Sequence, residues 1–229
     1  MAVSVAVFDA YGTLFDVAAA ARKAASEPGG ARLAAHWPAV AASWRTKQIA
    51  YSWHRAITGR HIDFWRVTQD GLDWALEAHG LSGDDALRAR LLALYRELEA
   101  YPEAPAMLAA LKAAGLGTAI LSNGSPEMLD AAVTSAGIGG VLDAVLSVES
   151  VGVFKPHRSV YDLVGAHFRV APKDVLFVSS NGWDAAAAAA YGFRTAWVNR
   201  AGEPMEKLPD APETVLKDLT GIPALAARV

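Results

Sequence analysis

Polar side chains follow four of the apolar segments in this sequence, directly after three of them and in the loop after the other. In order of the segments they are Asp9; Ser122 and Asn123; Lys155; and Ser179, Ser180, Asn181 and Asp184. In an open parallel sheet, ligands bind beyond the carboxyl ends of the strands, where such side chains come together. The pattern therefore predicts one polar site assembled from four strand ends.

Asp9 is the candidate nucleophile of this site. A carboxylate just past a buried strand lies close to apolar surface yet open to a cleft, and Asp is an ordinary residue for covalent catalysis. Gly12 permits a tight turn whose N–H groups face an anion. Taken alone, Asp9 is equally consistent with a helix or turn cap. Lys155, before Pro156, is the natural counter-charge that keeps a carboxylate ionised, and the proline predicts that this lysine stands at a helix entrance.

Five short apolar segments predict the sheet that positions these groups. They are residues 3–8, 117–121, 141–146, 175–178 and 195–198. Each is continuous rather than alternating, which is typical of strands covered on both faces. Helix-like stretches separate the later segments and end at glycines: residues 105–114, 126–136 and 184–191. The alternation predicts right-handed βαβ units and an α/β, doubly wound parallel-sheet, Rossmann-like core.

The region between the first and second predicted strands differs from the rest. Residues 16–101 hold five of the seven tryptophans and no convincing strand, and polar and aromatic residues around Trp44 recur at helical spacing. We therefore predict a core domain of residues 1–15 plus 102–229 and an inserted helical cap subdomain of residues 16–101. A length of 229 residues fits this division, since it corresponds to roughly one and a half domains.

Composition excludes several classes of function. The 21 basic and 24 acidic residues give a net charge of -3, so no general attraction to nucleic acid or to an anionic membrane is expected. The absence of cysteine removes disulfides and thiolate chemistry. No apolar stretch approaches the roughly 18 residues of a membrane span, and no segment resembles a signal peptide, so a cytoplasmic protein is expected. A Gly-x-Ser-x-Gly nucleophile elbow is also absent.

Four motifs together resemble the haloacid dehalogenase (HAD) superfamily. They are residues 9–14 (Asp-Ala-Tyr-Gly-Thr-Leu), 121–124 (Leu-Ser-Asn-Gly), 154–156 (Phe-Lys-Pro) and 179–184 (Ser-Ser-Asn-Gly-Trp-Asp). They occur in the order and spacing of that superfamily, and the predicted insertion falls where the family carries its cap. Tyr11 and the last motif are most similar to the (S)-2-haloacid, or type II L-2-haloacid, dehalogenases.

The same motifs separate this sequence from the metal-dependent phosphatases of the superfamily. Those enzymes carry a second Asp two residues after the nucleophile, where this chain has Tyr11, and acidic metal ligands after the fourth strand, where only Asp184 remains. Since Mg²⁺ prefers carboxylate oxygens in octahedral geometry, we expect no metal and no cofactor. The alternatives are a Mg-dependent phosphatase and a catalytically silent binding protein of the same fold.

The resemblance implies hydrolytic dehalogenation of short-chain L-2-haloalkanoic acids to D-2-hydroxy acids. Asp9 displaces the halide in an SN2 step, and water then hydrolyses the aspartyl ester. In this scheme Lys155 holds Asp9 and Asp184 positions Lys155, while Thr13 and Ser179 orient the Asp9 carboxylate. The family is commonly homodimeric, so a homodimer is expected.

The resemblance also assigns the groups around the substrate. Ser122 and the backbone N–H groups of Ala10 and Tyr11 bind its carboxylate, Asn181 positions the water, and Tyr161 corresponds to an active-site tyrosine of the family. The halide is held by Arg45, Asn123 and Trp183. The full substrate-binding set is Ala10, Tyr11, Ser122, Asn123, Lys155 and His54.

His54 departs from the family, which usually has Leu at that point on the face of the cap near the substrate. One hypothesis is that His54 narrows or polarises the pocket and favours small substrates, fluoroacetate among them. The alternative is a tolerated polar residue without a role, which is the commoner state of a lone histidine.

Overall fold

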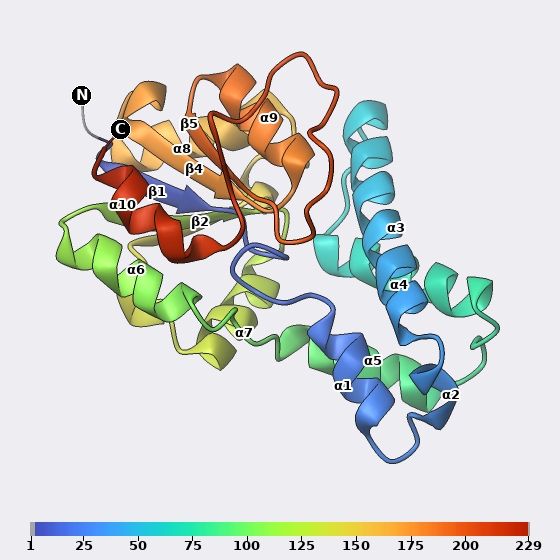
Figure 1. Cartoon of the computed structure of the whole chain (residues 1–229). Helices are drawn as coiled ribbons and strands as arrows, with labels where there is room; N and C mark the ends of the chain where they lie inside the picture. Colours follow the sequence, from blue (N-terminus) through green and yellow to red (C-terminus); the bar gives the residue numbers. More distant parts are fainter. Residues whose placement is uncertain (1–2, 229) are drawn as a thin grey trace.

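A six-stranded, fully parallel sheet forms the centre of the molecule in the computed structural model, which describes residues 3–228 (Figure 1). The strands lie in the order β3-β2-β1-β4-β5-β6. Their bounds are β1 Val5–Phe8, β2 Gly117–Ser122, β3 Ala144–Ser147, β4 Val175–Ser179, β5 Arg194–Val198 and β6 Thr214–Leu216. The chain winds outward in both directions from β1 and β4, so the switch point at which such sheets bind ligands lies between these two strands. The predicted doubly wound α/β fold is confirmed.

Helices cover both faces of the sheet. One layer contains α6, α7 and α10 and the other contains α8 and α9 (Figure 1). Their bounds are α6 Ala104–Ala113, α7 Pro126–Ala136, α8 Arg158–Phe168, α9 Gly182–Tyr191 and α10 Ile222–Ala226. Every residue of β1 and β4 is buried between these layers, which explains why both strands are continuous apolar runs.

Two strands depart from the sequence-based expectation. The apolar run 141–146 begins in a 3-10 turn, and β3 itself starts only at Ala144. As an edge strand, β3 is incompletely covered, and Val145 is 41% exposed, so the prediction of two covered faces was wrong for it. The opposite edge strand, β6, was not predicted because its three residues are too few to show a pattern.

A separate helical layer stands beside the carboxyl end of the sheet (Figure 1). It consists of α1 Ala19–Ser26, α2 Ala31–Ala34, α3 Trp37–Thr58, α4 Phe64–Ala78 and α5 Asp85–Arg96. Helices α3 and α4 are locked by buried polar contacts, in which Trp44 Nε1 donates to Thr68 O (2.8 Å) and Gln48 Nε2 donates to Thr68 Oγ1 (2.9 Å). Gly71 permits this close approach, since an added Cβ would lie 3.3 Å from the backbone nitrogen of Gln48.

The chain enters and leaves this helical layer along two adjacent segments. The N–H of Asp16 donates to Glu99 O (3.1 Å), and the N–H of Tyr101 donates to Leu14 O (2.8 Å). This pairing is what an insertion between β1 and β2 requires. The domain boundaries at residues 16 and 101 stay a prediction.

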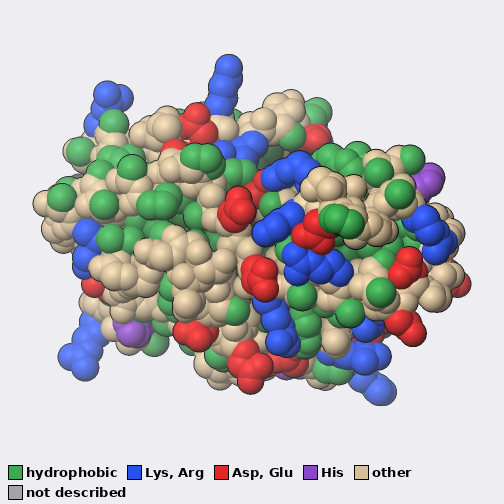
Figure 2. Space-filling view, turned by 90° about the horizontal axis from the view of Figure 1, so that it is seen from below, with side chains coloured by type: hydrophobic (Ala, Val, Ile, Leu, Met, Phe, Trp, Pro, Cys, Tyr) green, Lys and Arg blue, Asp and Glu red, His purple; other side chains and the backbone are tan. Residues whose placement is uncertain are grey.

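The surface carries no strongly basic region on the face seen in Figure 2, where Lys and Arg side chains are interspersed with Asp and Glu. Across the described part of the chain, no helix combines the length and apolar character needed to cross a membrane.

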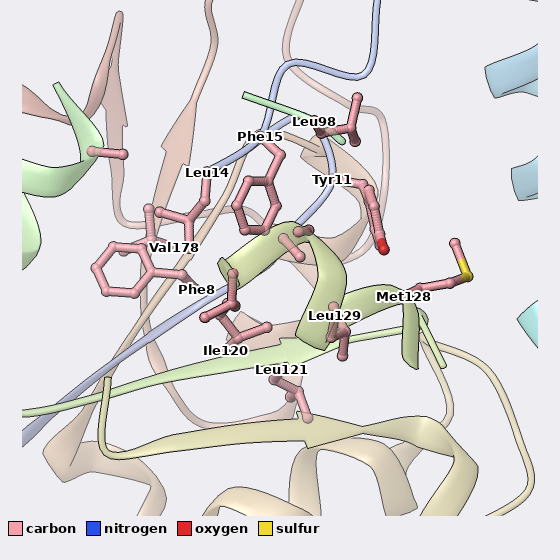
Figure 3. Packing of buried hydrophobic residues seen from close by; sticks show 14 of the residues in the cluster. Phe8, Tyr11, Leu14, Phe15, Leu98, Ile120, Leu121, Met128, Leu129 and Val178 are labelled. Carbon is pink, nitrogen blue, oxygen red and sulfur yellow. The ribbon is translucent and has the colours of Figure 1, made fainter. Parts of the chain in front are cut away.

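Phe15 anchors the junction between the sheet and the helical layer. It is fully buried and lies among Leu14, Tyr11 and Leu98 in Figure 3. Phe15→Ala should lower the free energy of unfolding by about 3–5 kcal/mol because it leaves a cavity in a packed region. Urea unfolding of both proteins measures this. Ile57→Ala, at a side chain that is 86% exposed, is the control and should change stability by no more than about 0.5 kcal/mol.

Candidate active site

The strand ends and helix α3 enclose one small polar cavity. The volume of this cavity is about 20 Å³, which is room for one or two waters. The lining residues are Asp9, Tyr11, Arg45, Ile49, Ser52, Phe64, Ser122, Asn123, Lys155, Asn181 and Trp183. The cavity thus brings together residues from four strand ends and from the helical layer.

The Asp9 carboxylate lies in the wall of this cavity and accepts three hydrogen bonds. Lys155 Nζ lies 3.2 Å from Oδ1, while Thr13 Oγ1 (3.1 Å) and Asn181 Nδ2 (2.9 Å) both donate to Oδ2. An ionised carboxylate offers about four acceptor positions. One position on Asp9 therefore stays open.

Lys155 links Asp9 to a second buried carboxylate. Its Nζ donates to Asp184 Oδ2 (2.8 Å), and Tyr161 OH donates to Asp184 Oδ1 (2.7 Å). Burial of the ammonium opposes its charge, but the attraction of Asp184 and Asp9 outweighs this and raises the pKa of Lys155. Burial raises the pKa of Asp184, which the Lys155 ammonium opposes. Burial, followed by the nearby Asp184, raises the pKa of the Tyr161 phenol well above its usual range, so Tyr161 stays a donor.

The serines after β4 have different partners from those expected. Ser179 Oγ accepts from the N–H of Asn181 (3.1 Å). Ser180 instead bonds Thr13, with its N–H donating to Thr13 Oγ1 (2.8 Å). The expected hydrogen bond from Ser179 to Asp9 is not among those of the described residues, since the Ser179 hydroxyl bonds the backbone two residues further on; a role of Ser179 in orienting the nucleophile stays a prediction. Asn181 does donate to Asp9.

Two groups of donors, on the cavity wall and directly next to it, have hydrogens left for an anion: the Ser122 hydroxyl, and the backbone N–H groups of Ala10 and Tyr11. Ser122 Oγ accepts from the N–H of Gly124 (3.1 Å), which leaves its hydroxyl hydrogen available. Among residues 3–228, the N–H groups of Ala10 and Tyr11 donate to no protein acceptor. Buried N–H groups rarely lack a partner, so this trio is suited to a carboxylate ligand.

Arg45, Asn123 and Trp183 lie on the cavity wall as candidate halide ligands. Arg45 Nη2 donates to Tyr11 O (3.2 Å) and Asn181 Oδ1 (3.0 Å), which leaves other guanidinium hydrogens available. Asn123 Oδ1 accepts from the N–H of Lys155 (2.9 Å), so its NH₂ group remains a donor. Trp183 Nε1 is buried and bonds no described residue.

Tyr11 occupies the position of the second carboxylate in the phosphatases. Its ring stacks on Tyr95 at 5.5 Å between centroids, and its buried hydroxyl has no partner among the described residues. Burial, then Tyr95 and Asp9, raise its pKa well above the ordinary value, so the phenol is neutral. A neutral ring here gives the cavity an apolar wall.

The residues of this site do not suit a divalent cation. Within residues 3–228 no group of three or more His, Cys, Asp or Glu side chains could hold a metal ion. Asp9 and Asp184, the buried carboxylates among the described residues, both bond the Lys155 ammonium. A cation would have to displace this charge.

His54 lies outside the site. Its side chain is exposed and lines a separate groove with Asp70, Asp73 and Glu77. On helix α3 its position points away from the cavity, where Ile49 and Ser52 stand instead. The substrate-binding expectation for His54 was therefore wrong. Ile49 and Ser52 were missed, although they follow Arg45 by four and seven residues, the spacing of one helix face.

The structure corrects the expected place of Lys155 and shows the surroundings of Tyr161. Helix α8 begins at Arg158, with His157 as its cap. Lys155 therefore lies in the loop before the helix and not at its first residue. Tyr161 is fully buried and is not part of the cavity lining. It donates to Asp184, and its role in the reaction stays a prediction.

Known proteins share this arrangement. A family model described as haloacid dehalogenase-like hydrolase matches residues 3–192. (S)-2-haloacid dehalogenase 1 of Pseudomonas sp. strain CBS-3 is 43% identical over 223 residues, covering 97% of this chain and 96% of the relative. (S)-2-haloacid dehalogenase of Xanthobacter autotrophicus is 45% identical over 198 residues, covering 86% of this chain and 75% of that protein.

A solved structure gives the same result in three dimensions. L-2-haloacid dehalogenase from Xanthobacter autotrophicus with chloropropionic acid covalently bound aligns with a TM-score of 0.88 and 38% identity, over 98% of both chains. The chain belongs to the haloacid dehalogenase-like hydrolases. It is an enzyme, a hydrolase whose relatives are named for action on 2-haloacids.

Lys155 should hold this site together up to high pH. Because its folded-state pKa is raised, its contribution to stability is complete below the unfolded value of about 10.4 and is lost only as the pH rises through the folded value. Lys155→Met leaves two buried carboxylates unpaired and should cost about 3–5 kcal/mol. The free energy of unfolding should be measured for both proteins across the pH range. The difference between them should be constant from neutral pH up to the pKa of Lys155 in the unfolded chain, and smaller above that pKa. A difference that already shrinks near neutrality contradicts the assignment.

Proposed function

We propose that this enzyme hydrolyses short-chain (S)-2-haloalkanoic acids to (R)-2-hydroxy acids through an ester on Asp9. The observation that carries the proposal is the Asp9 carboxylate itself, which three donors orient beside a closed cavity lined by further unused donors. The relatives named as (S)-2-haloacid dehalogenases support it. So does the related structure with chloropropionic acid covalently bound.

In the first step an Asp9 oxygen attacks C2 of the substrate. The open acceptor position is on Oδ1, which has a single donor, whereas Oδ2 has two. A lone pair of Oδ1 forms the C–O bond as the C–halogen bond breaks, and the halide departs with the bonding electrons. Attack from the side opposite the halogen inverts C2. Lys155 and Asn181 hold the carboxylate in line for this attack.

The substrate carboxylate and the departing halide need different partners. Ser122 and the N–H groups of Ala10 and Tyr11 take the carboxylate, and this contact orients C2 toward Asp9. Arg45 and the Asn123 amide stabilise the negative charge that develops on the halogen, and the indole of Trp183 offers a weakly positive edge. Halide is a stable anion, so no general acid is required at the position of Tyr11.

In the second step water attacks the carboxyl carbon of Asp9. The ester C–O bond on the Asp9 side breaks, the 2-hydroxy acid leaves with its new hydroxyl oxygen from Asp9, and the water oxygen remains in the Asp9 carboxylate. The net reaction consumes one water and releases one halide and one proton. Asn181 and Thr13, which bond Oδ2, hold the carbonyl during this attack.

The same proposal includes the surroundings of the reaction. Helices α1–α5 act as the cap over the cavity and supply Arg45, and the small size of the cavity favours short acids over long ones. The Tyr11 position and the Lys155-bonded carboxylates favour dehalogenation over Mg-dependent phosphate transfer, while the open position on Asp9 favours a working enzyme over a silent binding protein. The proposal also includes a homodimer, which the family resemblance implies.

Chloride release from (S)-2-chloropropionate tests the proposal directly. The wild type should release chloride and a proton in equal amounts, and Asp9→Asn should lower the rate by at least about a thousandfold because the nucleophile is lost. The (R) isomer and p-nitrophenyl phosphate, with and without Mg²⁺, are the comparison substrates. Release of phosphate but not chloride would establish the phosphatase alternative, and release of neither would favour the binding protein.

Oxygen-18 water tests the ester intermediate. During repeated turnover in H₂¹⁸O, the label should enter the Asp9 carboxylate because water attacks that carbon, and mass spectrometry of the peptide containing Asp9 should show it. In a single turnover with excess enzyme, the hydroxy acid should carry unlabelled oxygen from Asp9. A product labelled in the first turnover would mean direct attack of water on C2.

A further inference from the structure

A polar contact joins the loop between α3 and α4 to the 3-10 turn Val148–Ser150, which follows β3. His61 Nε2 lies 3.0 Å from Glu149 Oε2, across 88 positions of sequence. Within residues 3–228, the side-chain hydrogen bonds from residues 37–78 to the sheet layer come from two side chains, Arg45 and His61. Arg45 is part of the cavity and His61 is not.

The contact lies where three segments of the site meet. The His61 ring packs on Phe154 at 4.6 Å between centroids, and Phe64, which lines the cavity, packs on the same ring at 5.8 Å. Phe154 is fully buried and directly precedes Lys155. His61 therefore touches the segment that carries Lys155 and stands three residues before a wall of the cavity.

Glu149 is anchored to the segment that binds the substrate carboxylate. Its N–H donates to Ser147 Oγ (3.2 Å), and Ser147 Oγ donates to Gly124 O (2.6 Å), directly after Asn123. A carboxylate only accepts hydrogen bonds, so His61 must donate from Nε2. The other polar atoms, His61 Nδ1 and Glu149 Oε1, are buried without a partner in the described chain. The bond between Nε2 and Oε2 is therefore the one hydrogen bond that the side chain of either residue makes within the described chain.

We propose that His61 is a positioning residue that, through Glu149, clamps the α3–α4 loop onto the sheet layer and holds Phe64 over the bound substrate. The proposal rests on the proposed function in that it assigns the clamp to the same cavity. Lys155 has its own buried partners in Asp9 and Asp184. The clamp thus acts on substrate binding more than on the chemical step.

Steady-state kinetics on (S)-2-chloropropionate test the clamp. His61→Leu keeps an apolar contact with Phe154 but removes the donor, and should raise KM about tenfold, equivalent to about 1.4 kcal/mol, with kcat nearly unchanged, the pattern of lost uniform binding. Glu149→Leu should give the same increase. The double variant should be no worse than either single variant, because one contact is lost in all three. Glu149→Gln, which keeps an acceptor, should restore most of the affinity.

His79→Leu is the matched control. It breaks a histidine contact of similar length, His79 Nε2 to Ser43 Oγ (3.0 Å), that stays inside the helical layer, and should leave KM unchanged. The proposal is overturned if His61→Leu leaves KM unaltered, even if its melting temperature falls. It is also overturned if the increase in KM of the double variant is the product of the increases in the two single variants. Should His61→Leu fail to fold, the comparison of Glu149→Leu with Glu149→Gln decides.

Amide hydrogen exchange separates this proposal from the proposed function because it needs no turnover. Residues 59–67 should exchange faster in His61→Leu than in the wild type, whereas His79→Leu should match the wild type there. If the wild type releases no halide but this difference appears, the clamp stands and the assigned reaction fails. If halide is released but exchange and KM are unaltered, the reaction stands and the clamp fails.

Discussion

The buried ammonium of Lys155 is the interaction on which the structure of the site depends. It lies between two carboxylates, Asp9 at 3.2 Å and Asp184 at 2.8 Å, and is itself 1% exposed. Removing such charges from water costs several kcal/mol for each ion unless partners compensate. The three residues follow different strands, so the sheet must bring β1, the loop after β3, and the segment after β4 together for any of them to be buried. Tyr161 completes the arrangement by occupying the remaining oxygen of Asp184.

This charge arrangement also limits the chemistry. With an ammonium bonded to both carboxylates, the site presents donors and an aromatic wall rather than a set of ligands for a divalent cation. Such surroundings are suited to an anionic substrate whose leaving group departs as an anion. Tyr11 stacks on Tyr95 and occupies the position at which the related phosphatases carry a second Asp. A halide leaves as a stable anion and does not need the proton that such an Asp would supply.

Two side chains of helix α3 and of the loop after it hydrogen-bond the sheet layer within the described residues. Arg45 reaches from α3 to Tyr11 O and Asn181 Oδ1, so the guanidinium is fixed by the same asparagine that donates to Asp9. His61 reaches from the next loop to Glu149. Arg45 lines the cavity whereas His61 does not, which allows the two contacts to be altered independently.

The sequence determined much of the fold and most of the site. The apolar runs located β1, β2, β4 and β5, because strands buried on both faces must be continuously apolar, whereas the edge strands β3 and β6 were misjudged or missed, since their burial depends on neighbours that no local pattern reveals. Motif spacing indicated the candidate nucleophile and its ammonium partner, because the carboxyl ends of parallel strands converge.

What only the tertiary structure decided was the direction of individual side chains. The sequence could not show that Ser179 turns back to Asn181, that His54 faces a surface groove, or that Ile49 and Ser52 face the cavity. Local spacing places residues on the faces of a helix, but which face meets the site depends on how that helix packs on the sheet. The His61–Glu149 contact is the extreme case, since 88 positions separate two residues that no shared motif connects. Convergence of strand ends is a rule of the backbone, whereas the pairing of particular side chains across two layers is decided by packing alone.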